Sequence, residues 1–148
     1  MEKKLILEIR VKIDGSEISS LSGPGGGVLM IPFGGTAAGE IFQGRVCPGG
    51  VDVQQVNLSG VRHMQARYML EGTDHTGAAC RIYIENNGWS AEGEEGPVFK
   101  TVPTFLTDSA ALAPYLHRNC FVGEGIPDEQ GVLIRLYEAL DNPPDEKR

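Results

Sequence analysis

The fold of this chain is decided by residues 66–86, which read ARYMLEGTDHTGAACRIYIEN. Asp74 suits the first position of a tight turn and Gly77 suits its left-handed position, so the chain is expected to reverse there. A hairpin closed at this turn brings opposite charges together on one face and apolar side chains on the other. The expected pairs are Glu71 with Arg81, Met69 with Tyr83 and Arg67 with Glu85 on the first face, and Leu70 with Ile82, Tyr68 with Ile84 and Ala66 with Asn86 on the second. A slip of one residue would destroy both matches, so this register is well specified.

A second reversal is expected at Pro48-Gly49-Gly50, because proline suits the first turn position and Gly50 can adopt the left-handed conformation. The expected pairs are Val46 with Asp52, Gly44 with Gln54, Phe42 with Val56 and Glu40 with Leu58. This register puts Asp52 and Gln54 on an apolar face, with Gln54 opposite Gly44, where a ligand would find space.

Further strands are expected on both sides of these hairpins. Residues 5–13 alternate apolar and polar side chains with a period of two, which is typical of a half-buried strand. Pro32 confines the strand at 28–33 to an edge or a bulge. Later strands are expected at 99–107, 119–123 and 132–137, and Asp108 or Ser109 can cap a short helix that ends at Leu116.

Short strands at regular spacing with little helix between them are typical of an all-β sandwich or barrel. Hairpins between sequence neighbours favour a closed antiparallel meander barrel of about eight to nine strands, with one short helix near the C-terminus. Residues 1–140 are expected to form this single domain, and the polar tail 141–148 is expected to be disordered.

Composition limits the partners and the compartment. The chain has 148 residues, 20 glycines and a net charge of −7, so neither nucleic acid nor an anionic membrane is an expected partner. No apolar run approaches the ~20 residues of a membrane span. The three cysteines are widely spaced and odd in number, which favours free thiols in the cytoplasm.

Several motifs together resemble the family called domain of unknown function 3237. The match extends over nearly the whole chain. The stretches that carry it are Ile31-Pro32-Phe33-Gly34-Gly35-Thr36, Gly44-Arg45-Val46 with Pro48-Gly49-Gly50-Val51-Asp52, Ala66-Arg67-Tyr68-Met69-Leu70, Asn86-Asn87-Gly88, Phe99-Lys100-Thr101-Val102-Pro103-Thr104-Phe105 and Phe121-Val122-Gly123.

The chain departs from the family pattern where Val53, Val98-Phe99-Lys100-Thr101 and Tyr115-Leu116-His117 replace an expected tryptophan, Tyr-Phe-Arg-Thr and Trp-Leu-Asn. The resemblance implies a lipocalin-like barrel. It supplies no catalytic residue and no cofactor.

The sequence contains no metal-binding or nucleophile motif, so no metal or cofactor is expected. Asp52 is the candidate catalytic residue, because a carboxyl group among apolar neighbours has a raised pKa and can act as a general acid or base. The alternative is that Asp52 only caps the backbone beside Gly49 and Gly50. Candidate ligand-binding residues on the expected lumen face are Phe42, Gln54, Tyr68, Asn86, Lys100, Thr101 and Phe105.

Three functions are compatible with this pattern. The first is binding of a small, partly apolar molecule in the lumen, because barrels of about eight strands can hold one such ligand. The second is a cofactor-independent isomerase, cyclase or hydratase in the same lumen, in which Lys100 or Tyr68 stabilises an enolate. The third is a structural oligomerisation module with a filled core. Ile6 and Ile41 fall on otherwise polar strand faces, which predicts a homo-oligomer.

Overall fold

The computed structural model describes residues 2–90 and 99–140, and the hairpin at 66–86 has the predicted register. β6 (Arg62–Asp74) pairs with β7 (Ala79–Ser90), and every one of the six predicted pairs is found. The turn also has the predicted chemistry. The Asp74 carboxylate accepts hydrogen bonds from the backbone N–H groups of Thr76 and Ala78, and Gly77 has a φ of 88°.

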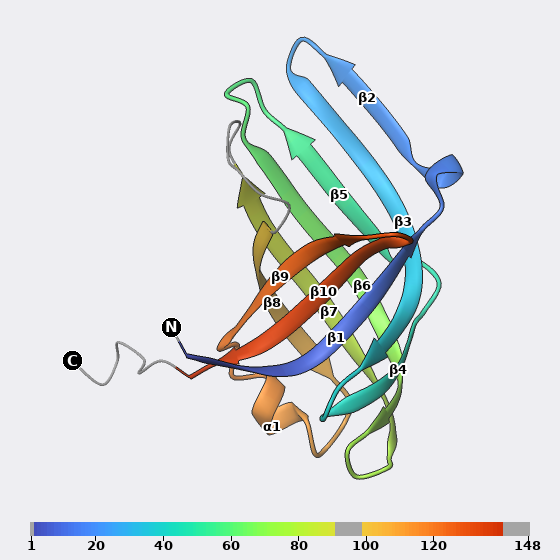
Figure 1. Cartoon of the computed structure of the whole chain (residues 1–148), viewed down its shortest axis with the longest axis vertical. Coiled ribbons are helices and arrows are strands. Elements are labelled where there is room, and N and C mark those ends of the chain that lie inside the picture. Colours follow the sequence, from blue (N-terminus) through green and yellow to red (C-terminus); the bar gives the residue numbers. More distant parts are fainter. Residues whose placement is uncertain (1, 91–98, 141–148) are drawn as a thin grey trace, which may run out of the picture.

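The described part of the chain is almost entirely β-structure, as predicted (Figure 1). Its other elements, in chain order, are β1 (Lys3–Ile13), the 3₁₀ turn η1 (Gly15–Glu17), β2 (Ser19–Gly23), β3 (Gly26–Ala38), β4 (Phe42–Val46), β5 (Val51–Val56), β8 (Phe99–Thr107), α1 (Ala113–Leu116), β9 (Phe121–Asp128) and β10 (Gly131–Ala139).

These strands form one antiparallel sheet that closes into a barrel. The sheet follows the order β1, β10, β9, β8, β7, β6, β4, β3, and the return pairing of β1 with β3 closes it. β4 and β5 share one position, because both lie between β3 and β6. The closed antiparallel meander barrel predicted from the sequence is therefore confirmed, with eight positions around the ring and β2 outside it.

The expected hairpin at Pro48-Gly49-Gly50 is wrong. β4 and β5 do not pair with each other but follow one another along the same strand position. Pro32 lies opposite Val51 and Thr36 lies opposite Arg45, so a separation of four positions along β3 corresponds to six positions from β4 to β5. Proline and glycine therefore mark an insertion within a strand, a bulge, rather than a reversal. Gly44 consequently faces Gly72 and not Gln54.

β3 changes partner at Pro32. Residues 26–30 of β3 pair with β2, and residues 33–38 pair with β1. Pro32 lies in the gap between these two ladders, where the backbone N–H that it lacks is not needed. The prediction that Pro32 marks an edge or a bulge agrees with this position.

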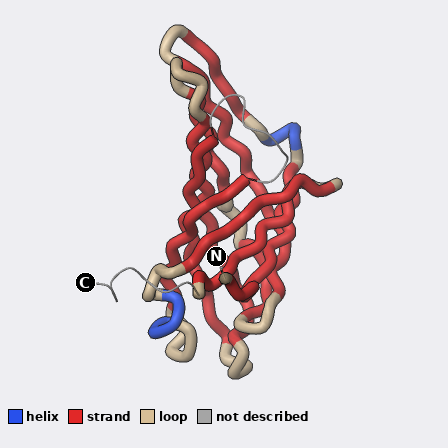
Figure 2. Tube along the Cα trace, turned by 60° about the vertical axis from the view of Figure 1, so that its left-hand side comes forward, coloured by secondary structure: helices blue, strands red, loops and turns tan. Residues whose placement is uncertain are grey.

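The core fills the inside of the barrel, and the strands cross it obliquely (Figure 2). Ile6 and Ile41, expected on the surface, are only 1% and 9% exposed. The register of β1 against β10 shifts between Leu5 and Leu7, and this bulge lets Ile6 and Leu7 both point inward. The predicted oligomer contact at Ile6 and Ile41 is therefore wrong.

The segment around α1 closes one end of the barrel (Figure 1). Leu112 and Leu116 are fully buried there. The Ser109 hydroxyl donates to Asp74 over 2.6 Å and accepts from the Leu112 N–H, so the short helix is tied to the β6–β7 turn. Within the described residues, no helix has the length and apolarity needed to cross a membrane.

The close approach of β4 and β6 gives a first prediction. A Cβ at Gly72 would collide with the backbone carbonyl of Gln43, whereas a Cβ at Gly34 would meet nothing within 4 Å. We expect Gly72→Ala to lower the free energy of unfolding by about 1–3 kcal/mol, the usual cost of overpacking. Gly34→Ala, the matched control on β3, should change it by less than about 0.5 kcal/mol. Urea titrations measure both free energies of unfolding. Equal losses in the two variants would contradict the close packing of Gly72 against Gln43.

Candidate functional site

The barrel contains a cavity of about 50 Å³, which is lined by Phe99 and Thr101 near the start of β8, whereas α1 follows the end of that strand. Most of its wall is apolar, and the lining residues are Val11, Ile13, Ile31, Phe33, Asp52, Met64, Ala66, Tyr68, Asn86, Phe99, Thr101, Val132 and Ile134. Ile13, Ile31, Phe99 and Val132 are partly exposed. The cavity therefore reaches from the buried core toward the surface of the barrel.

Three adjacent strands create this space. Asp52 on β5 lies opposite Ala66 on β6, and Ala66 lies opposite Asn86 on β7. The single methyl group of Ala66 thus separates two polar side chains in one cross-strand row. A larger residue at this position would fill the space that the three side chains share.

Four polar atoms in the cavity wall have no hydrogen-bond partner among the described residues. They are Asp52 Oδ1, Tyr68 Oη, Asn86 Oδ1 and Thr101 Oγ1, and they are the buried unpartnered side-chain atoms of the described residues. Tyr68, Asn86 and Thr101 are each no more than 6% exposed. A buried polar group without a partner costs about 1–3 kcal/mol, so four such atoms make this cavity the candidate site for a polar ligand or for water.

Asp52 is held by a short relay of side chains. Arg62 Nη1 donates to Gln54 Oε1 over 2.8 Å, and Gln54 Nε2 donates to Asp52 Oδ2 over 2.8 Å. Because a guanidinium can only donate, the amide oxygen of Gln54 must face Arg62 and its amino group must face Asp52. The relay fixes one oxygen of Asp52 and leaves Oδ1 free in the cavity.

The cavity alters the acidity of both its titratable groups. Burial raises the pKa of Asp52, although the hydrogen bond from Gln54 and the charge of Arg62 lower it in part. Burial, and then the charge of Asp52, raise the pKa of Tyr68 far above that of a solvated phenol. Tyr68 therefore presents a neutral hydroxyl beside a carboxyl group that is a weaker acid than usual.

The sequence motifs and the barrel now agree with a known family. The family model described as a protein of unknown function, DUF3237, matches residues 2–139. This chain is a member of the DUF3237 family. A UPF0311 protein of Clostridium acetobutylicum is 33% identical over 124 residues, which cover 74% of this chain and 75% of the relative.

Solved structures show the same barrel. A protein of unknown function from Clostridium acetobutylicum is similar with a TM-score of 0.77 and 28% identity, covering 93% of this chain and 99% of that one. A conserved protein of unknown function from Rhodopseudomonas palustris has a TM-score of 0.72 and 26% identity, covering 94% and 97%. The DUF3237 chain thus shares its fold with these two proteins along almost its whole length.

Four of the eight site residues predicted from sequence line the cavity, namely Asp52, Tyr68, Asn86 and Thr101. Gln54 lies behind Asp52 and orients it. Phe42 and Phe105 are buried in the core but do not line the cavity, and Phe105 packs edge-on against Phe121. The expectation for Lys100 is wrong, because residues alternate along β8 and Lys100 points to the outside while Thr101 points in.

One alternative raised from the sequence is also ruled out by the structure. Asp52 Oδ1 has no partner and Oδ2 binds a side chain, so Asp52 does not cap the backbone beside Gly49 and Gly50. Within the described residues, no group of three His, Cys, Asp or Glu side chains is placed to hold a metal ion.

Sequence reasoning missed Ala66 and Arg62. Ala66 was already placed beside Asn86 by the predicted hairpin, and its small size next to a polar residue could have indicated a void. Arg62 gave no such signal, because its contact with Gln54 depends on the register of β5 against β6, which the sequence did not reveal.

The pKa of Asp52 is raised and that of Asp74 is lowered, so the two residues should affect the stability of the fold with opposite pH dependences. The raised pKa of Asp52 means that its contribution to stability is fully present below about pH 3.9, the pKa of an unfolded aspartate, and is lost as the pH rises through the folded value. We therefore expect Asp52→Asn to become increasingly more stable than the wild type as the pH rises from 4 to 7, measured by urea unfolding.

Asp74 is the matched control. Hydrogen bonds from Ser109 and Thr76 hold its pKa below the usual range, so its contribution is present at neutral pH and is lost as the pH falls. Asp74→Asn should be less stable than the wild type at pH 7, with the difference shrinking toward acid. The burial of the Asp52 carboxyl group would be contradicted if the stability of Asp52→Asn relative to the wild type stayed constant or fell as the pH rises.

Proposed function

We propose that the barrel binds a small, uncharged, partly apolar molecule whose polar head enters the cavity. The observation that carries this proposal is the convergence of four unpartnered polar atoms on one otherwise apolar space. Binding sites for small molecules have this composition, with apolar walls and a few polar groups that fix the orientation of the ligand.

The charges of the wall support an uncharged ligand. The described residues that line the cavity include no lysine, arginine or histidine, and the nearby Arg62 is already bonded to Gln54. A carboxylate or phosphate would have no counter-charge here and would meet Asp52. A hydroxyl or carbonyl group, in contrast, can bond to Tyr68 and Thr101 without burying a charge.

The volume limits how much of the ligand is enclosed. A cavity that admits benzene measures about 150 Å³, and this one measures about 50 Å³. The polar head therefore fits between Asp52 and Asn86, and the apolar remainder extends past Met64 and Phe99 toward the partly exposed rim.

A second candidate function is acid–base catalysis in the same cavity. It is favoured by the raised pKa of Asp52, by its free Oδ1 atom and by the neutral hydroxyl of Tyr68. Asp52 would remove a proton from a carbon next to a ketone, and Tyr68 would donate a hydrogen bond to the resulting enolate oxygen. Lys100 has no part in this mechanism, because it lies on the outer face.

Ligand-observed NMR with neutral and charged probes tests the binding proposal. We expect cyclopentanone, cyclopentanol or phenol to bind and cyclopentanecarboxylate, a matched anion, not to bind. Ala66→Leu should abolish binding, because the larger side chain fills the cavity. Gln65→Leu, the neighbouring change on the outer face of β6, should leave binding intact.

Two results would contradict binding in the lumen. One is equal binding of the anion and the neutral probes, and the other is binding that survives Ala66→Leu. If none of the neutral probes binds while Ala66→Leu destabilises the fold through overpacking, the barrel has the filled core of a structural module instead.

Proton exchange tests the catalytic candidate. An enzyme that forms enolates should exchange the α-protons of cyclopentanone for deuterium in D₂O, and Asp52→Asn should slow this exchange by about 10²–10⁴-fold. Thr101→Val should weaken binding while leaving Asp52 in place. Exchange at the uncatalysed rate with wild-type protein that binds the ketone would leave binding as the function and exclude this chemistry.

A further inference from the structure

β2 has a free edge. Among the described strands, β2 pairs with β3 alone, whereas each of the others has partners on both sides. All five residues of β2 are exposed, and the strand projects with the first half of β3 beyond the β9–β10 hairpin (Figure 1). Backbone N–H and C=O groups along such an edge can pair with a further strand.

The edge lies in a segment without charge. Residues 18–39 contain no Asp, Glu, Lys or Arg, although these residues make up 22% of the chain. Soluble proteins usually protect a free edge with lysine, proline or an inward-pointing charge, and residues 19–23 contain none of these. In a protein with a net charge of −7, this is a surface that a second copy approaches with little repulsion.

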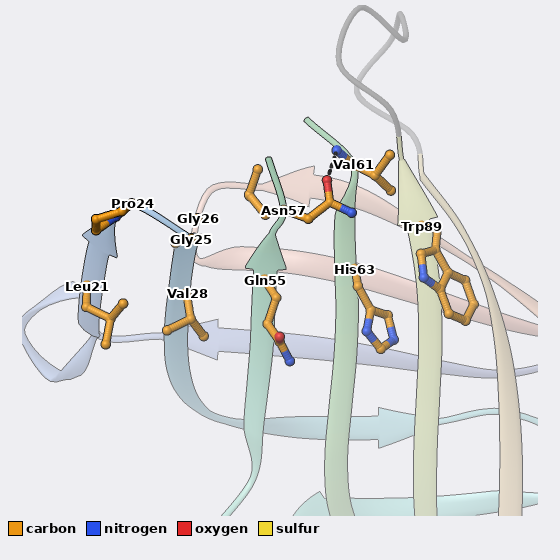
Figure 3. A pocket seen from close by; sticks show the side chains of 13 residues that line it. Leu21, Pro24, Gly25, Gly26, Val28, Gln55, Asn57, Val61, His63 and Trp89 are labelled. Atoms are coloured by element: carbon orange, nitrogen blue, oxygen red, sulfur yellow. Dashed lines mark hydrogen bonds between the residues drawn. The ribbon is translucent and has the colours of Figure 1, made fainter. Parts of the chain in front are cut away.

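The row of outer-face side chains that crosses the sheet to β2 is also uncharged. Leu21, Val28, Gln55, His63 and Trp89 form one row across five strands (Figure 3). They border a groove of about 540 Å³, and its described lining includes no Asp, Glu, Lys or Arg. Leu21 is 65% exposed at the end of the row, so a strand added beside β2 would extend the row and cover this side chain.

We infer that two copies of this chain pair along β2 in antiparallel fashion, with the two-fold axis at Leu21. This register places Ser19 opposite Gly23 of the partner subunit and Leu21 opposite Leu21 of the partner subunit. Glu17 then faces Gly25 of the partner subunit, so no like charges meet. The interface is self-complementary, as a two-fold dimer requires, and it is independent of any ligand in the lumen.

The size of the edge sets the expected strength. Five residues span about 17 Å of strand, and such a contact is smaller than the ~1,600 Å² of a standard stable interface. We therefore expect a monomer–dimer equilibrium that depends on protein concentration rather than a permanent dimer.

Analytical ultracentrifugation over a concentration series tests this dimer. Leu21→Lys places two like charges at the two-fold axis and should weaken dimerisation by about tenfold or more. Leu106→Lys is the matched control, because Leu106 is 64% exposed on strand β8 and makes no part of this edge. Both variants make the protein less acidic by one charge, so a selective loss in Leu21→Lys cannot come from overall repulsion.

Disulfide cross-linking locates the contact. Residues directly opposite in an antiparallel pair have Cα atoms about 4.5–5.5 Å apart, which is within the range for a disulfide bond. Leu21→Cys should form a covalent dimer under mild oxidation, whereas Leu106→Cys and the wild type, with its three native cysteines, should not. A wild type that stays monomeric up to about 1 mM, or a dimer that Leu21→Lys leaves unchanged, would overturn the inference.

Discussion

The pairing of β1 with β3 is the contact on which the rest of the structure depends, because it closes the sheet into a barrel. β1 leaves β3 after Ile13, and β2 takes its place along the first part of β3. The segment around α1 covers one end of the barrel, and the cavity with its partly exposed rim lies toward the other end. This single change of partner produces both the rim of the cavity and the free edge of β2.

Closure of the barrel also buries polar side chains that point inward, which is energetically unfavourable where their atoms lack hydrogen-bond partners. A core of this size could be filled with apolar residues alone, yet Asp52, Tyr68, Asn86 and Thr101 bring four unpartnered polar atoms to one space. No hydrogen bond within the described chain offsets the burial of these atoms. Such a pattern is expected where a fold retains polar groups for a ligand. Family membership does not supply a ligand, since the family model and the similar structure from Clostridium acetobutylicum are both described as proteins of unknown function.

Local sequence patterns predicted those parts of the structure that neighbours in sequence determine. The register of β6 and β7 followed from the Asp74–Gly77 turn and the matched pairs beside it, so Tyr68 and Asn86 were placed correctly. The bulge at Pro48-Gly49 was mistaken for a hairpin, because the same residues suit both and only the distant strands β3 and β6 decide between them. Asp52 was nevertheless predicted to point inward, because the expected register put it on the same face as Phe42 and Val46, and in the structure all three side chains do point inward. Lys100 was misplaced because it was assigned to the same face as Thr101, whereas neighbouring residues of a strand point to opposite faces.

If the four polar atoms form a binding site, a high-resolution crystal structure of the protein as isolated should show what they bind. We expect ordered density in the cavity within hydrogen-bond distance of Tyr68 Oη and Thr101 Oγ1, from a bound molecule or from waters that mark its polar head. A dry cavity in which these side chains turn to bond with each other, leaving no unpartnered atom, would contradict it.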